Sequence, residues 1–107
     1  MDIRKKDWKL FRERLSGWQE NYMEGLVKEY VNFLSDDKKP ASEKFWELER
    51  QIKEDKCHPG VIMEMSKSEV IWDIVRLIRL KVITYDDLSD FSDELQNEVK
   101  RILEMSR

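Results

Sequence analysis

The sequence predicts an all-α protein, a small helical bundle of four main helices with one or two short helical turns. Its 107 residues include only 3 Gly and 2 Pro, so few helix breakers interrupt the chain. Apolar residues recur at steps of three or four, and 4 Trp, 4 Phe and 3 Tyr can supply a core. We expect residues 1–107 to form a single helical domain, with residues 1–6 as a basic, flexible N-terminus.

The first helix is predicted from Asp7 to Leu34, where the apolar pattern is clearest. Gly17 and Gly25 each disfavour a helix by about 1 kcal/mol relative to Ala, but neither interrupts the apolar stripe. The stripe follows one helical face. Its members are Trp8, Phe11, Leu15, Trp18, Tyr22, Leu26, Tyr30 and Phe33/Leu34.

A second helix is predicted from Ser42 to Lys56, with Ser42 as its N-cap. Its apolar positions are spaced to point inward, and they are Phe45, Leu48 and Ile52. Pro59 is expected to open a short helical turn that carries Val61, Ile62 and Met65.

Two capping boxes mark the second half of the chain. Ser66 and Glu69 have the spacing of such a box and precede a helix over Val70 to Leu80, which is apolar nearly all round and is therefore expected to be the buried central helix. Thr84 and Asp87 repeat the spacing before a short turn. The last helix is expected to follow Ser92, with an inner stripe of Leu95, Val99, Ile102 and Leu103.

Three stretches, Pro40 to Val61, Val82 to Leu88 and Phe91 to Leu95, resemble a group of small all-helical bacterial proteins. The group occurs mostly in low-GC Gram-positive bacteria, and the resemblance runs over residues 7–103. It implies no catalytic or binding residues. Some members bear the label multidrug transporter, which does not fit this chain. Its most apolar segment, Val70 to Leu80, contains Asp73, Arg76 and Arg79 and is too short to cross about 30 Å of hydrocarbon.

Composition favours a cytoplasmic protein. A single cysteine cannot form an internal disulfide, which is typical of a reducing compartment. The basic start of the chain lacks the apolar core of a signal peptide. No run of 18 apolar residues occurs, so we expect no membrane span.

The sequence gives no support for catalysis, a metal or a cofactor. Cys57 and His58 are adjacent and follow Glu54 and Asp55, but a metal site needs three or four ligands at suitable spacing, and the second motif of a two-metal bundle is missing. The acidic segment from Asp86 to Glu94 is too short for a calcium loop and lacks its central glycine. Phosphate-binding loops rich in glycine are absent too. We therefore expect a noncatalytic protein.

Charge leaves nucleic acid as an alternative partner. Lys5, Lys9 and Arg12 share a helical face in a basic segment, and this stripe could meet phosphates. Against this, the net charge is -3, and residues 84–107 carry seven acids and three bases. The basic segment is therefore expected to lie against the acidic one, in this chain or in a second copy.

The leading hypothesis is a protein–protein interaction module that self-associates, most simply as a dimer. A helix from Asp7 to Leu34 spans about 42 Å, which is longer than a compact chain of this size is wide. Either the helix bends at Ser16-Gly17, or another chain, most simply a second copy, covers part of its stripe. The predicted partner-binding residues are Trp8, Phe11, Leu15, Trp18 and Tyr22, with Lys5, Lys9 and Arg12 as a charged rim. The alternative is a small nucleic-acid-binding regulator that uses the same basic residues.

Overall fold

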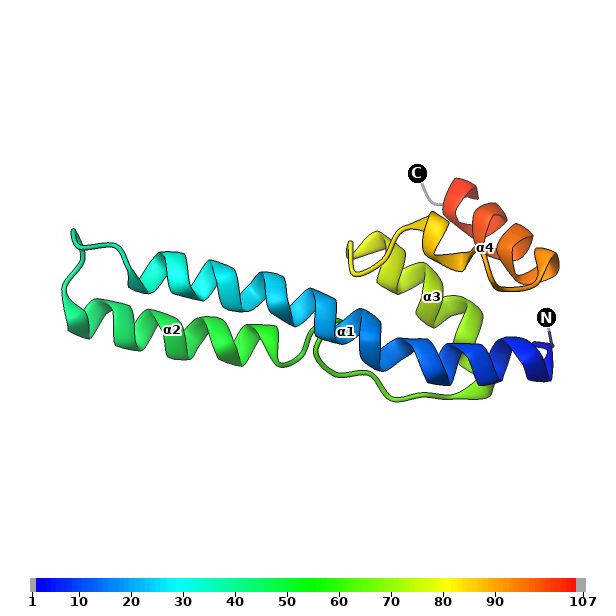
Figure 1. Cartoon of the computed structure of the whole chain (residues 1–107), viewed down its shortest axis with the longest axis horizontal. Coiled ribbons are helices and arrows are strands. Elements are labelled where there is room, and N and C mark those ends of the chain that lie inside the picture. Colours follow the sequence, from blue (N-terminus) through cyan, green and yellow to red (C-terminus); the bar gives the residue numbers. More distant parts are fainter. Residues whose placement is uncertain (1, 106–107) are drawn as a thin grey trace. The chain divides into compact units, whose positions relative to one another are not determined.

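The computed structural model describes residues 2–105 and is all-α, as predicted, with no strand in that range. The helices are α1 (Lys5–Leu34), α2 (Ala41–Asp55), α3 (Val70–Arg79) and α4 (Asp93–Met105), with 3₁₀ turns η1 (Lys67–Glu69) and η2 (Tyr85–Leu88) (Figure 1). Two compact units divide the chain: unit 1 holds residues 1–18 and 64–107, and unit 2 holds residues 19–63. The helix α1 contributes residues to both.

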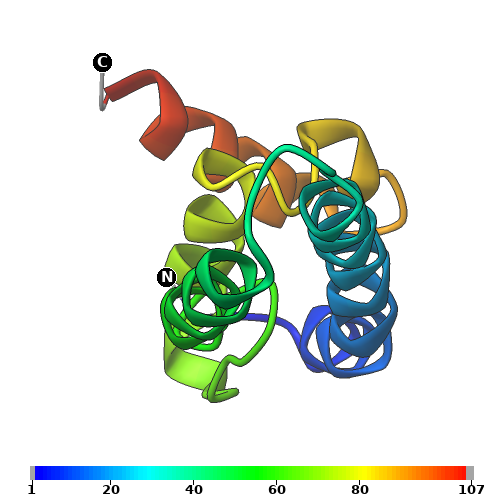
Figure 2. The ribbon, with the colours of Figure 1, turned by 90° about the vertical axis from the view of Figure 1, so that its left-hand side faces the viewer.

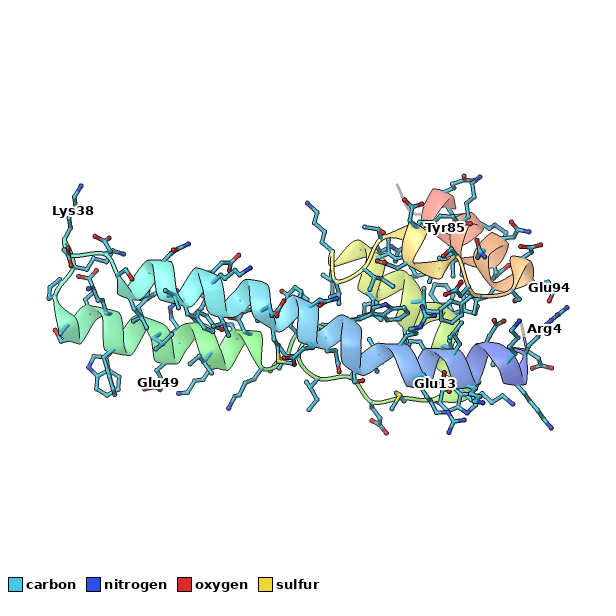
Figure 3. The ribbon with its side chains drawn as sticks, viewed as in Figure 1. Arg4, Glu13, Lys38, Glu49, Tyr85 and Glu94 are labelled. Atoms are coloured by element: carbon cyan, nitrogen blue, oxygen red, sulfur yellow. The ribbon has the colours of Figure 1, made fainter. Side chains whose placement is uncertain are left out.

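The N-terminal segment is more ordered than expected, because α1 already begins at Lys5. Residues 2–4 have no regular secondary structure, and Met1 lies outside the described residues. The guanidinium of Arg4 is 2.5 Å from a carboxylate oxygen of Glu94, and the two side chains point toward one another in Figure 3. Most of the predicted flexible segment 1–6 is therefore helix or ion-paired.

Among residues 2–105, the buried apolar side chains that form the core all lie in unit 1. These fourteen side chains come from the first part of α1, from α3 and α4, and from the segments between them. They are Phe11, Leu15, Trp18, Val70, Ile71, Ile74, Val75, Leu77, Ile83, Leu88, Phe91, Leu95, Val99 and Ile102. The prediction that α3 is buried all round is wrong for one face, because Trp72 remains 56% exposed. The remaining sides of this ten-residue helix carry its buried residues, which are Val70, Ile71, Ile74, Val75 and Leu77.

A buried carboxylate connects the first and last helices of unit 1. Asp7 is 1% exposed and accepts hydrogen bonds from the backbone N–H of Ser92 at 2.9 Å and from its hydroxyl at 2.6 Å. The same hydroxyl oxygen accepts the N–H of Leu95 at 3.2 Å, which makes Ser92 the cap of α4. Asp7 thus fixes the start of α4 against the first turn of α1.

The two predicted capping boxes have different outcomes. The box of Thr84 and Asp87 is confirmed, and the Asp87 carboxylate accepts the N–H of Thr84 at 2.7 Å. The box of Ser66 and Glu69 is wrong, because the Ser66 side chain makes no capping bond and instead lies 3.1 Å from the hydroxyl of Ser68. A 3₁₀ turn therefore precedes α3.

The end of α3 is closed by a left-handed residue. Lys81 has φ 62°, the one positive φ among the described residues other than glycine. Its N–H donates to the carbonyl of Ile78 at 3.0 Å, and the N–H of Val82 donates to that of Leu77 at 2.9 Å. This pair of bonds is the Schellman motif. It reverses the chain and brings Ile83 into the core, where 4% of it is exposed.

Unit 2 is a helical hairpin. The second part of α1 and the antiparallel α2 lie side by side, and residues 35–40 join them (Figures 1 and 2). The predicted cap at Ser42 is wrong by two residues, because α2 begins at Ala41 and Pro40 occupies the N-cap position. The short helical turn expected after Pro59 is a single hydrogen-bonded turn from His58 to Ile62, and it ends before Met65.

Candidate functional site

Three contacts set the register of the hairpin. Tyr22 of α1 lies level with His58, which follows α2, and Tyr30 donates its hydroxyl hydrogen to the Asp55 carboxylate. Near the joining loop, the ammonium of Lys44 donates to the carbonyl of Leu34 at 3.0 Å. Because the two helices are antiparallel, a residue farther along α1 lies level with a residue correspondingly earlier in α2.

The turn after α2 is fixed by tight packing around Tyr22. Its ring stacks on the imidazole of His58, with centroids 4.6 Å apart and 5° between the planes. The backbone N–H of Gly60 donates to His58 Nδ1 at 3.0 Å, so Nε2 carries the ring hydrogen and faces the Tyr22 hydroxyl at 3.3 Å. The side chain of Gln19 donates to the carbonyl of Pro59 at 3.0 Å. Pro59 and Gly60 are the buried residues of unit 2.

Farther along the hairpin, Tyr30 bridges the two helices. Burial, followed by the hydrogen bond to Asp55, raises the pKa of Tyr30 to about 12. The amide of Gln51 also donates to Asp55, at 3.3 Å. This polar bridge occupies the helix interface at a position where a smaller apolar pair would let the helices approach more closely.

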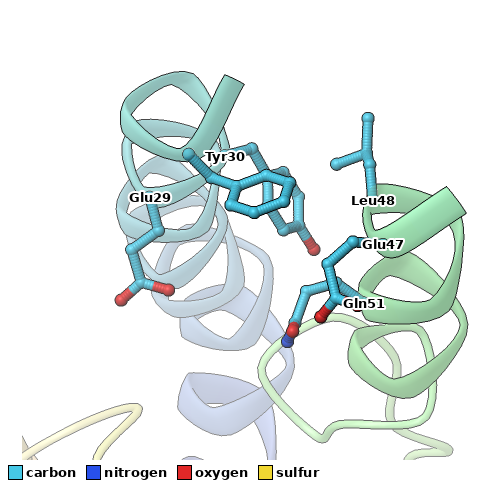
Figure 4. Close-up of a pocket in the computed structure, with 6 residues that line it drawn as sticks. Glu29, Tyr30, Glu47, Leu48 and Gln51 are labelled. Atoms are coloured by element: carbon cyan, nitrogen blue, oxygen red, sulfur yellow. The ribbon is translucent and has the colours of Figure 1, made fainter. Parts of the chain in front are cut away.

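A hollow lies on each side of Tyr30. One, shown in Figure 4, has a volume of about 210 Å³ and is lined by Glu29, Tyr30, Phe33, Glu47, Leu48 and Gln51. The other has a volume of about 230 Å³ and a mostly apolar lining. That lining consists of Met23, Leu26, Val27, Tyr30, Ile52, Asp55, Lys56 and Val61. Two helices alone therefore leave the hairpin incompletely packed.

The apolar hollow belongs to a largely apolar surface, which we call the hairpin face and which Glu49, four residues after Phe45, interrupts on α2. Val27 and Ile52 line the hollow from the two helices. Leu34 lies seven residues after Val27, and Phe45 seven before Ile52, so each repeats its neighbour's position two turns along. The hairpin face consists of Val27, Val31, Leu34, Phe45 and Ile52, which are 55%, 55%, 41%, 64% and 39% exposed.

Charged residues end the hairpin face near His58. Glu20 lies seven residues before Val27 and Glu24 seven before Val31, so they continue the strips of α1. Lys56, four residues after Ile52, continues the strip of α2. All three are exposed, and none of the ion pairs within residues 2–105 includes them.

Three of the predicted partner-binding residues are in the wrong place for that role. Phe11, Leu15 and Trp18 are 0%, 3% and 8% exposed, because the core of unit 1 covers them. A side chain that its own chain covers cannot also contact a partner in the folded state. Trp8 is half-buried and stacks on Phe11 at 6.4 Å, and Tyr22 is half-buried against His58.

The predicted charged rim is exposed, but acidic groups surround it. Lys9 lies 4.0 Å from Glu13, and the guanidinium of Arg12 lies 5.1 Å from the centre of the Trp8 ring. Lys5 is exposed one turn of α1 before Lys9. The expected contact of the basic segment with the acidic one occurs within this chain. It includes the 2.7 Å ion pair of Arg14 with Asp90 as well as that of Arg4 with Glu94.

Cys57 and His58 each contact groups of the hairpin. The exposed thiol of Cys57 donates to the carbonyl of Lys53 at 3.8 Å, while both ring nitrogens of His58 already face Gly60 and Tyr22. Across residues 2–105, no three His, Cys, Asp or Glu side chains gather in a way that could hold a metal ion.

The hairpin face was not predicted from the sequence. Phe45 and Ile52 were expected to point inward, but α2 has no buried residue. The signal was present: Val27, Val31 and Leu34 have the i, i+4, i+7 spacing of a second apolar strip beside the main stripe of α1. A helix with two apolar strips but only one neighbouring helix must leave one strip exposed, and this marks such a surface.

No protein family, curated protein or solved structure matches the chain. Of the helices in residues 2–105, none combines the length and the apolar character that crossing a bilayer requires.

Proposed function

We propose that the protein is a noncatalytic protein–protein interaction module and that the hairpin face is its binding surface. The observation that carries this proposal is the contrast between the two units. Unit 1 holds the buried apolar side chains found among the described residues, whereas unit 2 buries only Pro59 and Gly60 and leaves Val27, Val31 and Phe45 more than half exposed. A helix pair in water gains its stability by covering an apolar face, so an uncovered face favours a partner.

The composition of the hairpin face supports a protein as that partner. Stable interfaces combine an apolar centre with a charged rim, and aromatic side chains supply much of their binding energy. Phe45 of the hairpin face is 64% exposed, and its ring contacts edge to face that of Trp46, which lies beside the face and is 64% exposed as well, with centroids 5.0 Å apart. Such a pair is well placed to fill a hydrophobic pocket in another protein. A reducing, cytoplasmic setting is consistent with the exposed thiol of Cys57.

Nucleic-acid binding through Lys5, Lys9 and Arg12 has weaker support. Glu13 and Asp90 border the same surface and would repel phosphates. Such binding would weaken steeply with salt and with reversal of the three basic charges. Retention on DNA or RNA at low salt would favour this alternative.

Site-specific photocrosslinking in cells tests the proposal. A photoreactive amino acid at Val31 or Phe45 is expected to give covalent adducts with protein. The matched control is Asn32, which is exposed on α1 but lies about 100° around the helix from Val31. Equal or absent adduct formation at all three positions would overturn the proposal.

A further inference from the structure

We propose that the hairpin face binds a second copy of itself, with α1 of each copy lying over α2 of the other around a two-fold axis parallel to the helices. This inference rests on the proposed function and names its partner. The result would be a four-helix bundle made of two hairpins, in which the hairpin face of each copy covers that of the other.

Charge complementarity supports a second copy. Tyr22 lies level with His58, so Glu24, two residues after Tyr22, lies level with Lys56, two residues before His58. The two charges border opposite edges of the same hairpin face. A two-fold axis parallel to the helices exchanges those edges without changing the level. Glu24 of one copy then faces Lys56 of the second copy, and the reverse pair forms at the other edge.

The apolar residues match under the same operation. Val27 shares its level with Ile52, and Leu34 lies near the level of Phe45, as the bond from Lys44 to the Leu34 carbonyl indicates. Val27 and Leu34 therefore each meet an apolar residue of the second copy's α2. Val31 shares its level with Glu49, whose carboxylate pairs with Lys53 at 2.8 Å within its own helix. Phe45 of each copy thus lies near Leu34 of the second copy, and Glu24 of each copy lies near Lys56 of the second copy.

The other face-to-face arrangement is unfavourable. A two-fold axis perpendicular to the helices would place α1 over α1 and reverse the levels. Glu24 would then be buried near Leu34 of the second copy, and Lys56 near its Phe45. Burying unpaired charges against apolar side chains is costly, so the parallel axis is favoured.

The hairpin face together with its charged end, which holds Glu20, Glu24 and Lys56, is close to the size of a specific dimer interface. From Gln19 to Leu34 the helix spans about 24 Å, and two helices side by side are about 20 Å wide. The projected face is on the order of 480 Å² per copy, or about 960 Å² for both, before side-chain relief adds to it. A specific interface buries about 1,000 Å² or more in total.

Sedimentation equilibrium at micromolar concentration is the test. The wild-type chain is expected to sediment at twice 13.0 kDa. Val31→Glu is expected to weaken the dimer at least tenfold, because it places a charge at the centre of the hairpin face. The matched control Asn32→Glu adds the same charge to α1 outside the hairpin face and is expected to leave the dimer intact. Circular dichroism checks that each variant is folded.

A charge exchange tests the axis itself. Glu24→Lys and Lys56→Glu are each expected to weaken the dimer, whereas the double variant, or an equimolar mixture of the two single variants, is expected to restore it. A dimer that ignores these exchanges would overturn the parallel axis. A wild-type mass of 13.0 kDa at every concentration would overturn self-association. If crosslinks from Val31 to another protein then persist, the interaction module stands; if they are also absent, both proposals fail.

Discussion

The ring of Tyr22 contacts both the imidazole of His58 and the backbone of Gly60. A β-carbon at residue 60 would be 2.6 Å from Cγ of Tyr22 and 2.8 Å from its Cε2, closer than such atoms approach. Because the ring is also stacked on the imidazole of His58, a shift of Tyr22 would disturb that contact. This position therefore requires glycine for space, without a positive φ.

Gly60→Ala is expected to destabilise unit 2 by about 1 to 3 kcal/mol, which is typical of overpacking. Amide hydrogen exchange over residues 19–63 measures the change. The control is Gly25→Ala on the exposed surface of α1, where a β-carbon would meet nothing within 4 Å. That substitution should stabilise the helix by about 1 kcal/mol. Equal effects of the two substitutions would contradict the packing argument.

The stability of unit 2 should fall at alkaline pH because of Tyr30. Its pKa is about 12 in the folded chain and about 10 when unfolded. Between these values the unfolded chain releases the phenolic proton while the folded chain retains it, so stability declines as the pH rises from about 10 to about 12. Denaturation of the wild type and of Tyr30→Phe across this range measures the difference, and the variant should lose this part of the dependence. Asp55→Asn should lower the pKa of Tyr30, which tyrosinate absorbance would detect.

Asp73→Ala is expected to stabilise unit 1 by about 1 kcal/mol at neutral pH. Within residues 2–105, Oδ2 of Asp73 is buried without a hydrogen-bond partner. Burial and then the nearby Glu69 raise the pKa of Asp73, against a smaller opposing effect of Arg76. In the window between the unfolded and folded pKa values the folded chain holds more protons, so the wild type loses stability as pH rises through it. Urea denaturation should show that Asp73→Ala stabilises the protein less at pH values below that window. A stabilisation that does not change with pH would contradict this explanation.

Lys81→Gly is expected to stabilise unit 1 by about 1 kcal/mol, because glycine adopts a positive φ without the clash of a β-carbon. Lys81→Ala is the matched control, since it removes the same charge and side chain but keeps the β-carbon. It should give no comparable gain. Thermal unfolding measures both, and equal gains would indicate that the lysine side chain, rather than the backbone, is unfavourable.

Periodicity predicted where helices form, but not which apolar strips acquire neighbours. The stripe of α1 and the hydrophobic run of α3 identified both helices, and Leu95 and Val99 are buried as expected. Trp18 and Val31 are both apolar residues of α1, yet the first is 8% and the second 55% exposed. The difference depends on elements distant in sequence, which a local pattern does not contain.

Capping shows the same limit. Ser66 with Glu69 and Thr84 with Asp87 have identical spacing, but only the second pair forms the box. The side chain of Ser66 lies against Ser68 instead, a local competitor that Thr84 lacks. Among the candidate site residues, the spacing of apolar positions was enough to identify the aromatic stripe. The hairpin face could be identified only once the pairing of α1 with α2 was known.

The bond between Asp7 and Ser92 joins residues 85 positions apart. At a synthesis rate of about 5 to 20 residues per second, Ser92 is added about 4 to 17 s after Asp7. Until then the Asp7 carboxylate lacks the two groups of Ser92 that donate to it. The hairpin in between is local and can form earlier, on the ribosome, with its apolar side chains already displayed. Nascent chains on one messenger could thus meet through their hairpins before either has closed its core.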